Sequence, residues 1–319
     1  MPTKGLFSQS ACLLTDGRTT IDQVKRALDR EGYPALKEVS GAEDWCISGP
    51  SIVLEYLPEV NGFVSVDVVN HPWPDAMGDP KSDPTTFAAW GTSNFGPFAF
   101  PGGLSRACQN AWGWDDATKA VDAHRGFIRF RMSYAFGLPK NAPCLPKDYD
   151  PRAEVNFLSE LVLAAFRAPG VLCYFNPNGE VLLDYAGFRN MWNGCVEQDQ
   201  VPLPLWMNVR FYNLNDEFGL MDTVGNDQLD IKDVEAFFPN SEYDPNDVAN
   251  YLRNVTLYLL DAEREIKSDE AFDGPGETNL SWIVQCLDNG LISPPRHVLR
   301  LCPKTARRQI DKAIARAAK

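Results

Sequence analysis

The residue types most able to do chemistry are concentrated in one stretch, NHPWPDAMGDPKSDP. In it, His71 beside Asp75 could form an oriented general base, and Asp79 with Asp83 could hold a cation. Four prolines exclude a regular helix here, so the spacing does not place these side chains on one face. The ligand pattern of an EF-hand is also missing. We therefore predict a rigid recognition or bracing loop whose tryptophan is half-buried, and keep catalysis as the alternative.

The other candidates for chemistry are one cysteine and two histidines. Cys108 follows a Gly-Gly turn, and we predict that it lies early in a helix, where the thiol pKa is lowered. His124 and His297 have no partner at zinc-ligand spacing and are interpreted as structural. The chain contains no GxSxG, Walker lysine or GxGxxG motif. The sequence thus predicts no catalytic set, no metal and no cofactor.

Two further segments place aromatic side chains next to carboxylates: AWGWDDATKAVD and SDEAFDGPGET. This combination suits recognition of a basic protein, since buried aromatics anchor binding and charges guide the approach. The alternative is a helix cap next to core tryptophans, followed by an ordinary solvated loop. The residues predicted to bind a partner are His71, Trp73, Asp75, Asp79, Asp83, Trp112, Trp114, Asp115, Asp116, Asp269, Glu270, Asp273 and Glu277.

The net charge of −13 is unevenly distributed. Residues 304–319 hold six basic residues and one acidic residue, a net charge of +5, so the rest of the chain carries −18. A body this acidic repels nucleic acid and anionic membranes and attracts basic proteins. We expect a basic protein partner, and neither nucleic acid nor a membrane.

The bulk composition is that of a globular protein, with 44% hydrophobic and 23% charged residues among 319. No segment approaches the ~20 apolar residues that span a bilayer, and the first residues do not resemble a secretion signal. The eight cysteines are scattered, without a CxxC pair, as expected for free thiols in a reducing compartment. The predicted location is the cytoplasm.

Elements that would position these residues follow from the hydrophobic pattern. SACLLT, SIVLEYL and FVSVDVVN predict strands, and Thr20 caps a helix that ends before Pro34. Past residue 150 come a helix, AEVNFLSELVLAAF, and two strands, VLCYF and EVLLDY. Their NPNG turn could supply the positive φ of a tight hairpin from Asn and Gly. Asp244 caps a further helix, and KTARRQIDKAIARAAK predicts a basic terminal helix.

A repeated pattern suggests the architecture. VLEYLPEVNGFVSVD resembles VLCYFNPNGEVLLD, and later strands carry Arg-Phe in GFIRFRMSY and WMNVRFYNL. We predict an α+β fold of two related halves, each a mostly antiparallel sheet with helices on one face, and a possible internal duplication. The predicted boundaries are residues 1–150, with a long Pro- and Trp-rich insert at 70–124, residues 151–303, and the basic tail 304–319.

Four phrases together resemble a known family: GFVSVDVVNHPWPDAMGDP, PGVLCYFNPNGEVL, the stretch from NVRFYN to GLMDTVG, and PPRHVLRL. They are similar to the bacterial family called domain of unknown function 4261, over roughly residues 7–302. No chemistry is assigned to that family, so no catalytic residue is carried over. By association, acidic families of this kind often protect bacteria from toxins of contact-dependent secretion.

Three functions remain open. The first is a non-enzymatic acidic binding protein, most concretely an immunity protein that neutralises a toxin of a type VI secretion system. The second is a hydrolase or transferase with its site between the halves, using His71, Asp75 or Cys108. The third is a structural subunit of a larger assembly, docked through its basic C-terminal helix.

Overall fold

The computed structural model describes residues 4–40, 48–139, 143–262, 264–276, 280–310 and 312. Its contacts divide the chain into two compact units, which we call the N-terminal unit (residues 2–206) and the C-terminal unit (residues 207–319). The predicted boundary at residue 150 is therefore wrong. The first two strands after residue 150, at residues 171–176 and 181–183, complete the first sheet instead of beginning a second one.

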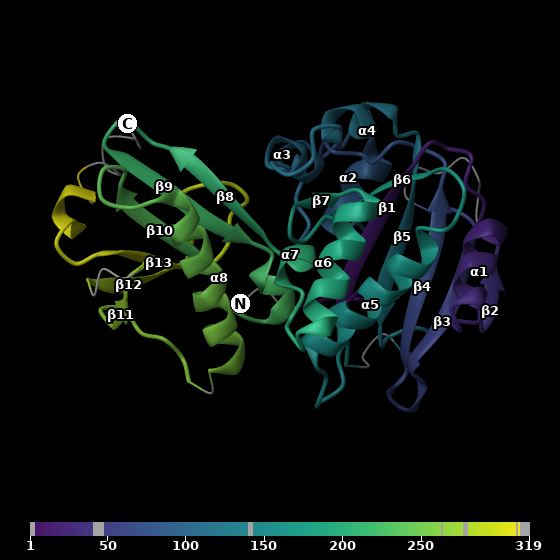
Figure 1. Cartoon of the computed structure of the whole chain (residues 1–319). Helices are drawn as coiled ribbons and strands as arrows, with labels where there is room; N and C mark the ends of the chain where they lie inside the picture. The colour runs from purple at the N-terminus through teal and green to yellow at the C-terminus, as the bar shows by residue number, and fades with distance from the viewer. Residues whose placement is uncertain are drawn as a thin grey trace. The chain divides into compact units, whose positions relative to one another are not determined.

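The N-terminal unit is built on a seven-stranded antiparallel sheet, in the order β2-β3-β4-β5-β1-β6-β7 (Figure 1). Its strands are β1 (Gln9–Thr15), β2 (Lys37–Val39), β3 (Ser51–Leu57), β4 (Gly62–Val69), β5 (Gly126–Ser133), β6 (Val171–Asn176) and β7 (Val181–Leu183). Its helices are α1 (Ile21–Arg30), the 3-10 turn η1 (Pro58–Val60), α2 (Pro84–Gly91), α3 (Gly103–Gln109), α4 (Ala117–Ala123), α5 (Pro151–Ala165), α6 (Tyr185–Glu197) and α7 (Leu203–Trp206).

Helices cover both faces of this sheet, because its central strands are apolar on both sides. Cys12 and Leu14 of β1 point to the cluster formed with α2, α3 and α4. On the opposite face, Tyr174 of β6 meets Phe188 of α6, with ring centroids 4.8 Å apart. The insert that the sequence presented as a long loop thus forms the short helices α2 to α4. They supply the second layer, where helices on a single face were expected.

The predicted helix cap at Thr20 and the predicted turn between the strands at residues 51–57 and 62–69 are confirmed. Thr20 forms a capping box with Gln23 at the start of α1, and Asn61 adopts the left-handed conformation, with φ 61°, at the turn between β3 and β4. The NPNG turn differs from its prediction, because the residue with positive φ is Glu180, at 51°. Asn176 fixes this turn differently, by accepting hydrogen bonds from the backbone N–H groups of Asn178 and Gly179 at 3.0 and 3.2 Å.

The C-terminal unit has a six-stranded sheet in the order β11-β12-β13-β10-β9-β8. Neighbouring strands are antiparallel except β10 and β13, which are parallel. The elements are β8 (Asn208–Asn213), β9 (Phe218–Val224), the 3-10 turn η2 (Asn226–Leu229), β10 (Asp233–Pro239), α8 (Pro245–Asp261), β11 (Ala271–Asp273), β12 (Ser281–Leu287) and β13 (Val298–Pro303).

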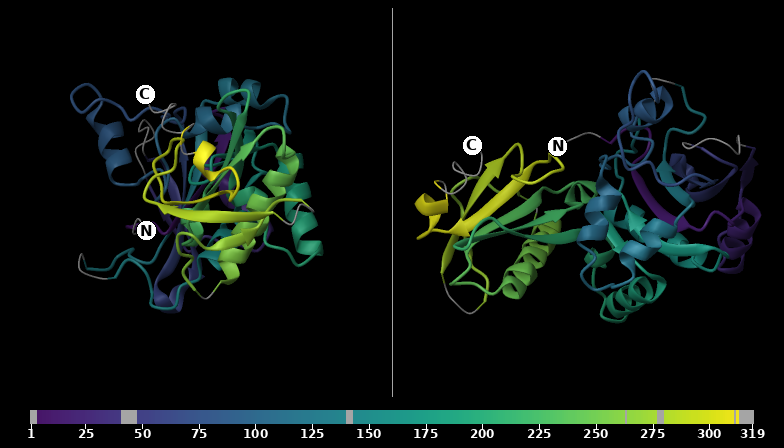
Figure 2. Two further views of the ribbon diagram at one scale, coloured as in Figure 1. Left: turned by 90° about the vertical axis from the view of Figure 1, so that its left-hand side faces the viewer. Right: turned by 90° about the horizontal axis from the view of Figure 1, so that it is seen from above.

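Helix α8 packs along one face of that sheet (Figure 2). As predicted, Asp244 caps it, accepting from the N–H of Asn246 at 2.7 Å, and Pro245 occupies its first turn. On the other face, Ala306 and Ile310 are buried against Phe218, Leu220 and Phe237. Residues 307–310 and 312 are helical, as predicted for the start of the basic tail; the rest of the tail lies outside the described residues.

The two hairpins of the inferred repeat, β3–β4 and β6–β7, belong to one and the same sheet. The two Arg-Phe strands, β5 and β8, lie in different sheets. Both units are mixed α+β, but this distribution does not support two halves related by duplication. Within the described part of the chain, no helix is long and apolar enough to cross a membrane.

Candidate functional site

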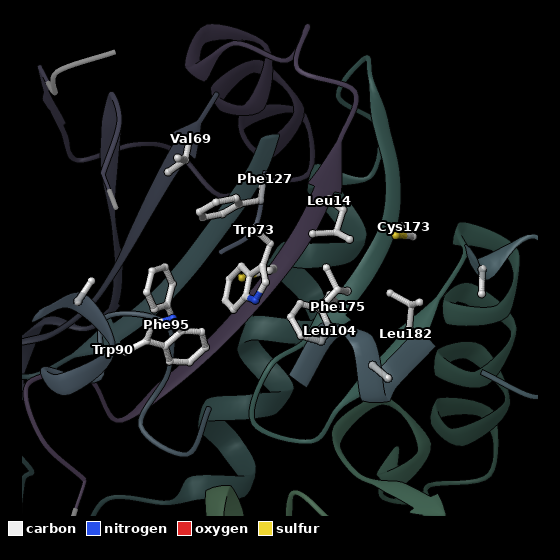
Figure 3. Packing of buried hydrophobic residues seen from close by; sticks show 14 residues of the cluster. Leu14, Val69, Trp73, Trp90, Phe95, Leu104, Phe127, Cys173, Phe175 and Leu182 are labelled. Carbon is white, nitrogen blue, oxygen red and sulfur yellow. The ribbon is translucent and has the colours of Figure 1, made fainter. Parts of the chain in front are cut away.

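Trp73 lies at the centre of the N-terminal core, not on a recognition surface (Figure 3). Only 4% of it is exposed, and its ring contacts Trp90, Phe95, Phe127 and Phe175 at centroid distances of 5.2 to 6.2 Å. The prediction that this tryptophan is half-buried is wrong, because it is almost wholly buried. The ring anchors the loop to the sheet, which leaves it no surface for binding.

The three aspartates of the same loop accept hydrogen bonds from their own backbone surroundings. Asp75 accepts from the N–H of Leu104 at 2.8 Å and from the N–H and Oγ of Ser105 at 2.9 and 2.6 Å. Asp79 accepts from the N–H groups of residues 81 and 82, which lowers the pKa of its carboxyl. Asp83 caps α2. The loop is therefore well braced, and three of its carboxylates help to brace it.

His124 and Cys108 are a described histidine and a described cysteine whose positions bear on the predicted chemistry. His124 ends α4, and its Nε2 accepts from the N–H of Trp73 at 3.0 Å while Nδ1 faces the Val121 carbonyl. His124 is thus the C-cap of α4, and both its ring nitrogens face backbone groups. Cys108 lies near the end of α3, and the prediction that it lies early in a helix is wrong. Among the described residues, no group of three or more His, Cys, Asp or Glu could hold a metal ion.

The turn between α3 and α4 does present an aromatic and acidic surface, which we call the Trp112 turn (residues 110–116). Trp112 is 73% exposed, and Trp114 packs against the core. Asp115 and Asp116 are exposed beside them, and Lys119 approaches Asp116 only to 4.0 Å. The turn is fixed by a hydrogen bond from the N–H of Trp114 to the Ala111 carbonyl at 3.0 Å. It thus offers a preformed aromatic anchor beside two solvated carboxylates.

The acidic segment of the C-terminal unit is partly occupied by cations of the same chain. Asp269 pairs with Arg307 at 2.7 Å. Glu270 accepts from the N–H of Lys267 and pairs with Arg264, and these contacts lower the pKa of its carboxyl. Asp273, in β11, is exposed, and Glu277 lies outside the described residues. Burial raises the pKa of Tyr251, and the negative charge of Asp273 raises it further.

Sequence reasoning missed a row of buried charges across the C-terminal sheet. Arg210, Asp222, Glu235 and Arg300 occupy directly paired positions on four adjacent strands. Arg210 donates to both carboxylate oxygens of Asp222 at 2.9 and 2.6 Å. Arg300 donates from Nε to Glu235 at 2.8 Å. All four side chains are at least nine-tenths buried, so each charge depends on its partner.

A loop between β12 and β13 closes over this row. Arg296 from the loop donates to Asp222 at 2.6 Å and lies 3.1 Å from Asp233. Burial alone would lower the pKa of Arg296, but the two carboxylates raise it. Nearby Asp227 has its pKa raised to about 7 by burial and then by the charge of Asp233. The ion pairs of Arg296 with Asp222 and Asp233 hold the loop on the sheet.

The N-terminal sheet carries a comparable pair. Arg129 on β5 donates to both oxygens of its cross-strand partner Asp67 at 3.1 and 2.7 Å. Burial favours the neutral acid, yet attraction to Arg129 and Arg131 lowers the pKa of Asp67 overall. The only signals of these pairs in the sequence were an arginine before phenylalanine and an aspartate inside apolar strands.

A comparison with protein families gives a match within the C-terminal unit. Residues 222–302 match the family described as Domain of unknown function (DUF4261). The match confirms the resemblance for this segment; it includes Asp222 and the PPRHVLRL phrase, while the two N-terminal phrases lie outside it. No curated protein and no solved structure matches the chain.

Proposed function

We propose that this chain is a non-enzymatic binding protein that offers an acidic, aromatic surface to a basic partner protein. The observation that carries the proposal is the Trp112 turn, where an indole that is 73% exposed stands beside two exposed carboxylates. An exposed tryptophan on a fixed turn is costly in water and becomes favourable when a partner buries it. Tryptophan is also among the residues that most often dominate binding energy at protein interfaces.

Charge supports the same proposal. The chain carries a net charge of −13, which speeds encounter with a positively charged protein and makes the association rate fall with ionic strength. Two of the residues considered for catalysis have structural contacts: Asp75 braces α3, and the Cys108 thiol contacts the Thr118 hydroxyl at 3.5 Å. These contacts favour a binding role over the alternative of a hydrolase or transferase.

The narrower proposal is that the partner is a toxin, delivered between bacteria by a contact-dependent (type VI) system, and that this chain is the immunity protein acting in the cytoplasm. Occlusion of a toxin requires a preformed surface and no turnover, which fits an aromatic anchor on a fixed turn. A basic toxin surface would complement the acidic body.

A photo-crosslinking residue at position 112, introduced in the source organism, tests the proposal. We expect it to capture one basic protein, while the same residue at Val60, which is also exposed, captures none. Capture of an acidic protein, or equal capture from both positions, contradicts the binding proposal. The captured protein is then expressed with and without this chain, and growth restored only by co-expression supports the immunity role. If its expression is harmless, the immunity role is wrong and the binding role stands.

A further inference from the structure

A groove on the N-terminal unit runs along α5, beside α6 and the residues that follow α1. Its volume is about 620 Å³, and the described side chains that line it come from those three segments. Ring contact between Phe166, which ends α5, and Tyr185, which begins α6, shows that the end of one helix meets the start of the other. The groove therefore lies along two antiparallel helices and is open to solvent.

The two helices line the groove with the same spacing. The first set is Asn156, Glu160, Leu163 and Ala164 of α5, with Arg167 just after the end of that helix, and the set from α6 is Tyr185, Arg189, Trp192, Asn193 and Val196. Both sets follow steps of four, three, one and three residues, so each set occupies one face of a helix, as in helices that pack side chains into one another. Eleven residues of helix correspond to about 16 Å, or about three turns. This geometry fits a third helix of that length.

The apolar part of the lining lacks a cover. Val196 is 59% exposed and Tyr185 is 40% exposed. Leu163 and Trp192 form a more buried apolar strip beneath them. Exposed apolar side chains gathered on one short helix indicate a surface that another protein covers.

The charges of the groove define what the occupant must carry. Arg167 already pairs with Glu31 at 2.7 Å, and Glu160 accepts from Tyr33 Oη at 2.9 Å. Arg189 lies over the Tyr185 ring, 5.6 Å from its centroid, and no described carboxylate lies within ion-pair distance of it. An occupant with a carboxylate next to its apolar face would complete the charge pairing at Arg189.

An extended peptide is a poorer occupant than a helix. The walls are helices whose backbone groups are hydrogen-bonded internally, so a strand in the groove would find no backbone partners. A helix satisfies its own backbone and needs only side-chain contacts. We propose that this groove binds an amphipathic helix of about three turns from a partner protein, with apolar residues spaced four, three and four apart and an acidic residue facing Arg189. The proposal is independent of the Trp112 turn.

The test uses a labelled synthetic helical peptide with leucines at that spacing and a glutamate beside them, together with a scrambled peptide of the same composition. Fluorescence anisotropy should show binding of the first peptide only. Val196→Glu and Arg189→Glu should each weaken binding at least about tenfold, and replacing the peptide glutamate with lysine should restore binding to Arg189→Glu. Leu36→Glu, a change at an exposed leucine outside the groove, should leave binding unchanged.

Both test residues are exposed, so the variants should fold, and circular dichroism checks this. Equal binding of the scrambled peptide, or binding unaffected by Val196→Glu, overturns the proposal. Absence of binding overturns it as well. A dimer that forms with concentration and is lost in Val196→Glu would identify a second copy of the chain as the occupant, and would also overturn it.

Discussion

Arg210 and Asp222 face each other across β8 and β9 with both side chains wholly buried, and the guanidinium contacts both carboxylate oxygens. Asp222 also accepts from Arg296, so one carboxylate joins a strand pair to the loop that follows β12. The buried guanidinium groups of Arg210 and Arg296 thus both donate to the Asp222 carboxylate. Its loss would leave both without their main partner.

Asp222→Asn should therefore destabilise the C-terminal unit by roughly 3–5 kcal/mol, the usual cost of breaking a buried ion pair from one side. Urea denaturation followed by tryptophan fluorescence measures the change. Glu265→Gln is the matched control, because it removes an exposed partner of Lys232 and should cost less than about 1 kcal/mol. If the two variants lose similar stability, the buried network does not hold this unit together.

The raised pKa of Asp227 predicts that the stability of the C-terminal unit depends on pH. Burial and the charge of Asp233 raise its pKa to about 7 in the folded protein, above the ordinary carboxyl value that holds in the unfolded chain. The folded state thus binds the proton more tightly. The stabilising contribution of the Asp227 proton to the free energy of unfolding is therefore complete below pH ~4. This contribution is lost as the pH rises towards ~7.

Asp227→Asn removes this titration. Compared with the natural protein, the variant should gain stability between pH ~4 and ~7, by at most about 4 kcal/mol from a shift of roughly three units. Urea midpoints at a series of pH values measure the difference. Parallel pH profiles for the two proteins would show that Asp227 titrates normally.

Two of the three tryptophans first grouped as binding residues, Trp73 and Trp112, should differ in their effect on stability. Trp73→Ala should cost about 3–5 kcal/mol, because it empties the centre of the aromatic cluster. Trp112→Ala should change the free energy of unfolding by less than about 0.5 kcal/mol, since the ring is exposed. Thermal or urea unfolding distinguishes them. A large loss of stability in Trp112→Ala would mean that the ring packs in the fold and is unavailable to a partner.

Local features of this fold could be predicted because each depends on neighbours in sequence. The capping box at Thr20, the cap at Asp244 and the strand at residues 51–57 follow from residue types a few positions apart. The class, with mixed helices and mainly antiparallel sheets, follows from the number and spacing of such elements.

The errors concern contacts between distant residues. Trp73 is buried because Phe95, Phe127 and Phe175 surround it, and no local pattern shows that. The boundary at residue 150 failed because β6 pairs with β1, more than 150 residues earlier in the chain. The Asp222 network was missed for the same reason, since its partner Arg296 lies 74 positions away.

Asp75 distinguishes bracing from chemistry in the loop that first suggested a reactive site. Its carboxylate accepts from the N–H groups of Leu104 and Ser105 in the first turn of α3, whose own N-cap, Gly102, has no side chain to offer. Asp75→Ala should therefore cost about 0.5–2 kcal/mol, as the loss of a helix cap does. Hydrogen exchange should accelerate at these two amides, while exchange in α8 of the other unit stays unchanged. Asp79→Ala, which removes a turn outside α3, is the control and should leave those amides protected. Unchanged exchange at Leu104 and Ser105 in Asp75→Ala would show that the carboxylate does not cap the helix, and would return Asp75 to the list of candidates for a role beside His71.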